Sequence, residues 1–415
     1  MQTLIKSELI SIGDELLSGS TVNTNAAWLG EQLAGLGLEV NWVTVIRDTP
    51  AEIETALQNA AHRADLVIIT GGLGPTPDDL TRQAVSRFFK AELVLHPGAL
   101  ENMKKIFAGR NLVMPEVNRV QAIVPQTAAL IDNPAGTAPG FEMEKQGKVF
   151  YFLPGVPLEM KMMMERTVLN RLKDRFAVQP IPEHLFRTTG IPESRVYEKI
   201  ADILERYPEF RTAFLPKTSG IDIRLKNYLL QPEAELRFTR CIDEIRFCLG
   251  KYIFSESAES LPEVIGRILT GKKLSLALAE SFSGGLIADW ITNVPGSSAH
   301  FKGSVITYSN ESKMNLLKVS ARSLEKYGAV SSEVALEMVH GVQQLFQVDC
   351  AIATTGIAGP TGATETKPLG LCFLAAVSGD QVRVRQFNFG RDRRVNKQRG
   401  AAAALELLRR ILLGI

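Results

Sequence analysis

Two serines and two glycines follow an apolar run in the C-terminal half of the chain. The segment from 279 to 285 is Ala-Glu-Ser-Phe-Ser-Gly-Gly. A strand-to-helix elbow would expose the hydroxyl of Ser281, and the N–H groups after it would form a site for an anion or an oxyanion. In a simpler interpretation, Ser281 or Ser283 caps the helix and the glycines ease a tight turn.

A lysine stands where it could serve as the base for such a serine. The segment from Tyr308 to Lys313 is Tyr-Ser-Asn-Glu-Ser-Lys, and no histidine lies near either motif. Lysine can act as a general base when burial depresses its pKa, and Tyr308 could relay a proton or orient the lysine. The alternative is a polar loop that carries a solvated lysine.

A third loop is rich in glycine and also follows an apolar run. The segment from 354 to 362 is Thr-Thr-Gly-Ile-Ala-Gly-Pro-Thr-Gly, and such a loop lets the backbone approach a ligand closely. All three loops follow predicted strands. We therefore expect them to converge on one crevice at the carboxyl edge of an open α/β sheet, which favours an enzyme.

The N-terminal part has a separate group of polar residues. The segment from 70 to 81 is Thr-Gly-Gly-Leu-Gly-Pro-Thr-Pro-Asp-Asp-Leu-Thr, between a buried apolar run and a helix. The glycines and the helix start favour a phosphate, but two adjacent carboxylates would repel it unless a divalent metal lay between them. The alternative role for this pair is helix capping. The candidate metal ligands, all at one predicted sheet edge, are Asp14, Asp48, Asp78 and Asp79.

The elements that must position these loops form two α/β blocks with a different segment between them. Residues 1–172 alternate strands and helices in a doubly wound pattern, and Asn25 is predicted to cap the first long helix. Residues 173–256 carry several prolines and predict a small α+β domain. Its expected helices span 193–206 and 234–249, and its expected strands lie near 185–189, 221–225 and 252–254. The α/β pattern resumes over residues 257–415 and ends with a helix expected from Ala401 to Leu413.

Composition excludes several classes of protein. The 415 residues carry 47 Lys and Arg against 45 Asp and Glu, a net charge of +2. This balance argues against a dedicated nucleic-acid or polybasic membrane binder. No run of 18 apolar residues predicts a membrane span. Four cysteines without a C-x-x-C motif, and a start unlike a signal peptide, predict a cytoplasmic protein.

Taken together, the motifs resemble the CinA (competence/damage-inducible protein A) family. The first domain resembles the family's N-terminal domain, itself similar to the molybdopterin-binding fold, through the segments 13–19, 23–25, 70–81, 136–140 and 153–160. The last domain resembles the CinA C-terminal domain, which also occurs alone as bacterial nicotinamide mononucleotide deamidase, through the segments 279–285, 308–313, 328–331, 355–360 and 367–370. The middle domain resembles the family's KH-type module but lacks a G-x-x-G clamp, so nucleic acid is not an expected partner.

For the C-terminal domain, the resemblance implies hydrolysis of nicotinamide mononucleotide to nicotinic acid mononucleotide and ammonia, without a metal or cofactor. Ser281 would be the nucleophile and Lys313 its general base, assisted by Tyr308 and Thr355. Ser283 stands where the family usually has Thr. The implied substrate-binding residues are Ser283, Gly284, Gly285, Gly356 and Arg393.

For the N-terminal domain, the resemblance implies hydrolysis of ADP-ribose to AMP and ribose 5-phosphate with a divalent metal (Mg, Mn or Co). The alternative is a non-catalytic module that binds a nucleotide or a pterin. The resemblance also implies a homodimer and a role in pyridine nucleotide salvage. The residues expected to bind the N-terminal substrate are Gly71, Gly72, Gly74 and Asn25.

Overall fold

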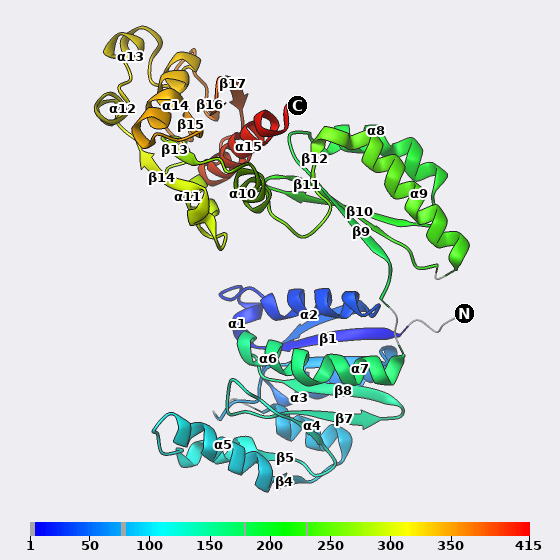
Figure 1. Ribbon diagram of the computed structural model, residues 1–415. Coiled ribbons are helices and arrows are strands. Elements are labelled where there is room, and N and C mark those ends of the chain that lie inside the picture. The colour runs from blue at the N-terminus through cyan, green and yellow to red at the C-terminus, as the bar shows by residue number, and fades with distance from the viewer. Residues whose placement is uncertain (1–4, 76–79, 178–179, 230) are drawn as a thin grey trace. The chain divides into compact units, whose positions relative to one another are not determined.

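The computed structural model describes residues 5–75, 80–177, 180–229 and 231–415. The chain forms two compact units, Met1–Ile181 and Pro182–Ile415, shown in Figure 1. Within the described ranges, no helix is both long and apolar enough to cross a membrane.

The first unit is built on a six-stranded sheet. Its strand order is β2 (Glu39–Ile46), β1 (Lys6–Ile12), β3 (Leu66–Thr70), β8 (Lys148–Leu153), β7 (Gly140–Lys145) and β6 (Ala129–Ile131). The first four strands are parallel, and β7 and β6 run antiparallel at one edge. A small second sheet pairs β4 (Leu93–Leu95) with β5 (Ile123–Pro125).

Helices cover both faces of this sheet. One face packs against α2 (Thr24–Gly35), α6 (Pro157–Met163) and α7 (Leu169–Phe176), and the other packs against α3 (Pro50–Arg63) and α4 (Thr81–Phe89). Helix α1 (Asp14–Leu17) has no buried residue, and α5 (Pro97–Gly109) packs in a small separate cluster beside β6. Strand β3 is buried along its whole length because its alternating side chains enter two separate cores. Val67 packs with α3 and α4, whereas Ile68 packs with α2 and α6. The predicted doubly wound class is confirmed, with an added antiparallel edge.

The predicted cap of α2 is wrong by two residues. Asn23 is the N-cap, and its side chain accepts a hydrogen bond from the N–H of Ala26 at 3.1 Å. Helical backbone already begins at Thr24, so Asn25 lies inside the first turn, where a cap cannot form. Its amide instead donates to the carbonyl of Gly155 at 2.7 Å.

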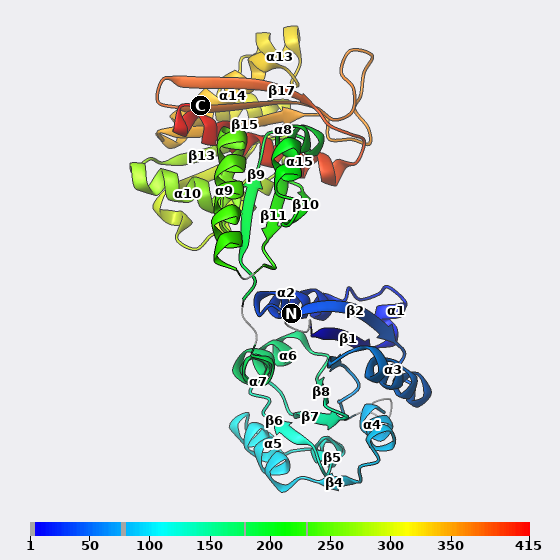
Figure 2. The same ribbon diagram turned by 90° about the vertical axis from the view of Figure 1, so that its right-hand side faces the viewer.

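The middle part of the chain forms an antiparallel sheet in the order β10 (Arg211–Lys217), β11 (Gly220–Lys226), β9 (Glu183–Thr188) and β12 (Ile253–Ser255). Helices α8 (Glu193–Arg206) and α9 (Pro232–Leu249) pack side by side on it, as Figure 2 shows. Both helices and three of the strands follow the predictions. Strand β10 has no strongly apolar face and was not predicted.

The C-terminal part contains a five-stranded sheet in the order β14 (Phe301–Ile306), β13 (Leu276–Glu280), β15 (Cys350–Gly356), β16 (Leu371–Ser378) and β17 (Gln381–Asn388). Strands β14, β13 and β15 are parallel, and the other two are antiparallel. The helices are α10 (Leu261–Lys272), α11 (Leu286–Thr292), α12 (Asn310–Leu317), α13 (Ala321–Tyr327), α14 (Ser332–Phe346) and α15 (Arg393–Leu413).

One face of this sheet packs against α14 and the other against α10, α11 and α15. Helix α15 begins eight residues before the predicted start at Ala401, because Asp392 caps it by accepting from the N–H of Val395. The same helix joins the middle sheet to this one. Buried Arg409 donates to the backbone carbonyl of Lys251 at 2.6 Å, which ties the two parts of the second unit together.

Candidate active site

The elbow after β13 carries the candidate nucleophile. The N–H groups of Ser281 and Phe282 both donate to the carbonyl of Thr354, at 3.0 and 3.4 Å, so the elbow is tied to the end of β15. Gly284 and Gly285 have φ angles of 59° and 89°, a backbone region that favours glycine. Gly285 is the N-cap of α11, and the hydroxyl of neither Ser281 nor Ser283 accepts a hydrogen bond from the first turn of this helix. The interpretation of either serine as a helix cap is therefore wrong.

Lys313 lies against the candidate nucleophile. Its Nζ donates to Ser281 Oγ at 3.2 Å and to the carbonyl of Thr307 at 2.8 Å. The side chain sits in the first turns of α12 and is only 1% exposed, so the alternative of a solvated lysine is wrong. Burial lowers the pKa of Lys313 to about 8, because the charged form loses its hydration.

The three predicted loops meet around one cavity of about 140 Å³. Buried Thr355 donates its hydroxyl to the carbonyl of Ala329 at 2.7 Å. At the exposed mouth, Arg393 donates to Tyr308 Oη at 3.0 Å and to the carbonyl of Gly359 at 2.7 Å. The expected convergence is confirmed. The lining residues are Ser281, Phe282, Tyr308, Lys313, Ala329, Val330, Thr355, Gly356, Ala358 and Arg393.

Two predicted substrate-binding residues have packing contacts that the motifs did not indicate. The hydroxyl of Ser283 is fully buried 2.8 Å from Thr354 Oγ1, and Ser283 does not line the cavity. Gly356 lines the cavity, but a Cβ there would stand 2.5 Å from Cys372 Cβ and 2.6 Å from Phe282 Cδ2. Close packing inside the domain thus requires this glycine, whether or not a ligand approaches it.

Sequence reasoning missed the carboxylate that holds the elbow. Glu280 is fully buried, and its two oxygens accept from the N–H groups of Ile287 and Ala288 at 3.1 and 2.9 Å. It also accepts from Ser304 Oγ at 3.2 Å. Glu280 thereby links β13, α11 and β14. The available signal was an acidic residue ending an apolar strand just before a helix N-terminus, where a negative charge is stabilised.

The candidate carboxylates of the first unit are only partly described. Strands β1 and β2 are parallel with Ile12 opposite Ile46, so Asp14 and Asp48 stand at equivalent positions two residues past their strands. A Cβ on Gly72 would lie 3.3 Å from Asp48 Oδ1. Asp78 and Asp79 lie outside the described residues. Within those ranges, no group of three or more His, Cys, Asp or Glu side chains could hold a metal ion.

The glycine loops of the first unit do lie together. The N–H of Gly71 donates to the carbonyl of Leu153 at 3.1 Å, and Gly155 lies against Gly71. Two buried side-chain oxygens beside these loops, Asn25 Oδ1 and Thr81 Oγ1, have no hydrogen-bond partner among the residues that the structure describes. A Cβ on Gly72 would stand only 2.0 Å from Thr81 Oγ1. The carbonyl of Gly74 accepts a hydrogen bond from Arg82 at 2.8 Å.

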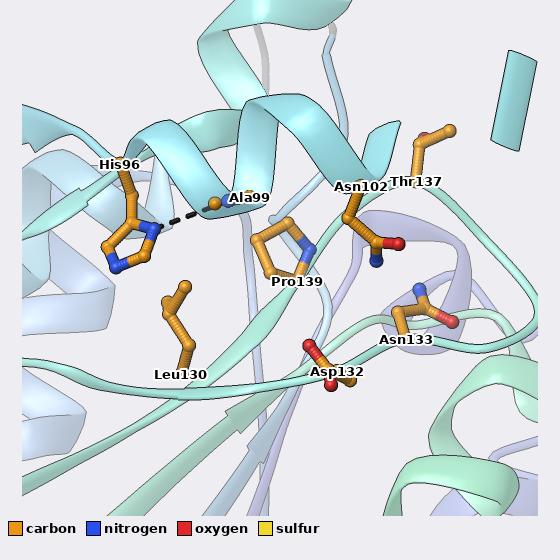
Figure 3. A pocket seen from close by; sticks show the side chains of 9 residues that line it. His96, Ala99, Asn102, Leu130, Asp132, Asn133, Thr137 and Pro139 are labelled. Carbon is orange, nitrogen blue, oxygen red and sulfur yellow. Dashed lines mark hydrogen bonds between the residues drawn. The ribbon is translucent and has the colours of Figure 1, made fainter. Parts of the chain in front are cut away.

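A larger cavity of about 270 Å³ lies elsewhere in the first unit, between α5 and the segment after β6. Figure 3 shows Asn102 and Asp132 pointing into it beside Pro139. None of the predicted site residues lines it. Sequence reasoning missed this cavity because its polar residues are scattered between 96 and 137, and only Thr137 lies in a segment that the resemblance singled out. These polar residues are His96, Asn102, Asp132, Asn133 and Thr137.

Comparisons with known proteins agree with this architecture. The chain matches three family models: a probable molybdopterin binding domain over 8–174, the KH domain of damage-inducible protein CinA over 183–255, and the CinA C-terminal domain over 258–412. Similar proteins, described as competence-damage inducible proteins, come from Caldicellulosiruptor saccharolyticus (39% identity over 98% of this chain and 99% of that one), Halothermothrix orenii (40%, 98% and 98%) and Clostridium botulinum (41%, 98% and 100%). With all three domains in this order over nearly its full length, the chain belongs to the CinA family.

Proposed function

We propose that the C-terminal domain is an amidohydrolase that converts nicotinamide mononucleotide to nicotinic acid mononucleotide and ammonia. The observation that carries the proposal is the buried contact between Lys313 Nζ and Ser281 Oγ, at 3.2 Å. A lysine with a pKa of about 8 is partly neutral near neutral pH and can then accept a proton. The resemblance to nicotinamide mononucleotide deamidase supplies the substrate.

In this mechanism, neutral Lys313 takes the proton of Ser281 as Oγ attacks the carboxamide carbon. The N–H groups of Gly284 and Gly285 make no hydrogen bond within the described residues and are the candidate donors to the oxyanion. The Lys313 ammonium then protonates the departing amine, and the C–N bond breaks to release ammonia. Water, deprotonated by Lys313, hydrolyses the acyl-serine to the carboxylate and restores the hydroxyl.

Ammonia release from nicotinamide mononucleotide, measured with chelator present, tests this proposal. We expect Ser281→Ala to lower the rate by at least about a thousandfold while leaving the melting temperature near that of the wild type. Ser323→Ala is a matched control because Ser323 is also followed by a lysine three positions later, yet it lies outside the cavity. Undiminished activity in Ser281→Ala would exclude Ser281 as the nucleophile.

We propose as a second activity that the N-terminal domain hydrolyses ADP-ribose to AMP and ribose 5-phosphate. The buried oxygens Asn25 Oδ1 and Thr81 Oγ1 lie beside the glycine loops and lack a partner within the described ranges, which favours a polar ligand there. A divalent cation would neutralise charge on the pyrophosphate, and Asp14 and Asp48 are the described carboxylates at this edge that could hold it. The family's metal dependence is the reason to expect such a cation.

AMP formation from ADP-ribose, with and without chelator, tests the second activity. We expect chelator and Asp48→Asn each to abolish it, whereas exposed Asp174→Asn, on α7, serves as the control. Turnover that survives chelator would contradict the role of the metal. Calorimetric binding of ADP-ribose without turnover would instead favour the non-catalytic binding module.

A further inference from the structure

The start of helix α15, which contributes Arg393 to the lining of the cavity, carries an unusual concentration of positive charge. Between 391 and 399, at the start of α15, five residues are Arg or Lys, and the one acidic residue is Asp392, which caps the helix. Cations at a helix N-terminus face the positive end of its dipole and destabilise it. An anion bound at this end would offset that cost. The five cations are Arg391, Arg393, Arg394, Lys397 and Arg399.

Two of these cations stand on the same side of the helix. Arg393 and Lys397 are four residues apart and therefore neighbours on one face. Lys397 Nζ lies 3.3 Å from the point where a Cβ on Gly284 would stand, so its ammonium covers the elbow that carries Ser281. Arg393 lines the cavity itself and reaches Tyr308. Arg393 therefore lies at the cavity, and Lys397 lies one helical turn away beside the elbow, just outside the lining.

The ammonium of Lys397 does not contribute a polar contact to the described fold. It makes no hydrogen bond or ion pair with any residue that the structure describes, and it is only half-buried. Arg393 donates hydrogen bonds to a tyrosine hydroxyl and to a backbone carbonyl, both of which are uncharged. Among the residues that the structure describes, no carboxylate forms an ion pair with either side chain. Both remain available to an anionic ligand.

The cavity is too small to enclose the whole substrate, so part of the substrate must stay outside it. About 140 Å³ is well below the roughly 300–1,000 Å³ of pockets that enclose a whole small ligand. The pyridine ring and its carboxamide must enter far enough to reach Ser281. The ribose phosphate is then left at the mouth, on the side of Arg393 and Lys397.

We infer that Lys397, together with Arg393, binds the phosphate monoester of the substrate and so selects a nucleotide over its nucleoside. This inference rests on the proposed deamidase function. Lys397 is a specificity-determining residue here, because an ammonium attracts a phosphate dianion but does not act on the carboxamide.

Steady-state ammonia release from nicotinamide mononucleotide and from nicotinamide riboside tests the inference, since the two differ only by the phosphate. We expect Lys397→Gln to lower the ratio of their kcat/KM values by about tenfold to a hundredfold, mainly through the KM of the nucleotide. Lys397→Arg should keep most of the preference. Arg399→Gln is the matched control, because it removes an exposed cation from another face of α15. An unchanged ratio in Lys397→Gln would overturn the inference and leave the deamidase standing.

A binding measurement separates this inference from the deamidase proposal. Calorimetry on Ser281→Ala, with and without Lys397→Gln, would compare the nucleotide, the riboside and inorganic phosphate. Tighter binding of the nucleotide than of the riboside, lost with Lys397→Gln, supports the inference even if the wild type releases no ammonia. Phosphate alone binding as tightly as the nucleotide would point to an independent anion site and contradict it. Equal binding of nucleotide and riboside would also refute it.

Discussion

The pH dependence of ammonia release is the most direct consequence of the buried lysine. A general base works only in its neutral form, and burial lowers the pKa of Lys313 from 10.5 to about 8. At pH 7.5, roughly a quarter of the molecules would carry neutral Lys313, against about one in a thousand at the ordinary pKa. Burial therefore raises the fraction of protein molecules with a neutral Lys313 by roughly 200-fold.

The expected profile follows from these fractions. Measured well below saturation, kcat/KM for ammonia release should rise about tenfold per pH unit up to pH 7 and level off above an apparent pKa near 8. Lys313→Arg should lose at least about a hundredfold at every pH, because a guanidinium stays protonated. Lys313→Met, compared by thermal melting, would show whether this site tolerates substitution without unfolding.

Two results would refute the reasoning. A flat profile of kcat/KM from pH 6 to pH 9 would show that no group with a pKa near 8 limits the reaction. Activity in Lys313→Arg within tenfold of the wild type would show that the reaction does not need a neutral lysine. Either result would remove Lys313 as the base, whatever the outcome for Ser281.

Three further predictions concern the support around the site. Between pH 8 and 10.5, Lys313 is protonated in the unfolded chain but neutral in the folded protein. The unfolding free energy of the wild type should therefore rise by up to about 3 kcal/mol over this pH range relative to that of Lys313→Met, as measured by denaturant titration. Glu280→Gln should weaken the link to the N–H groups of α11 and lower kcat about tenfold, while the midpoint of the pH profile stays unchanged; an unaltered kcat would contradict its positioning role. Gly356→Ala should lose about 1–3 kcal/mol by overpacking against Phe282, whereas Gly271→Ala, in open space on α10, should gain about 0.5–1 kcal/mol; equal melting temperatures would contradict the packing argument.

Several features of the site could be predicted because they depend on local order along the chain. Apolar runs that end in Ser281, Tyr308 and Thr355 indicate buried parallel strands with polar loops behind them. The carboxyl ends of parallel strands share one edge, so convergence follows without knowledge of the packing. The two α/β blocks and the helices of the middle domain follow from the same periodic signals.

Other features depend on contacts between distant segments and could not be predicted from spacing. The motifs left open whether the serines cap α11, and they misassigned the cap of α2 from Asn23 to Asn25. They also gave Ser283 a contact with the substrate, although its hydroxyl is directed to Thr354, 71 residues away in the chain. Two neighbouring residues of the same type, such as Asn23 and Asn25, have different contacts because the backbone turns between them. The position of that turn depends on how the segment packs on the sheet.

By itself, the sequence determined which chemical groups this protein brings to the carboxyl edge of its C-terminal sheet, because the succession of strands and loops along the chain is a local property. Only the tertiary structure decided their reactivity. Lys313 becomes a candidate base because the folded domain removes its ammonium from water, and Glu280 holds the elbow because three elements meet around its carboxylate. Desolvation and multiple hydrogen bonding arise from segments far apart in the chain, and no local pattern records them.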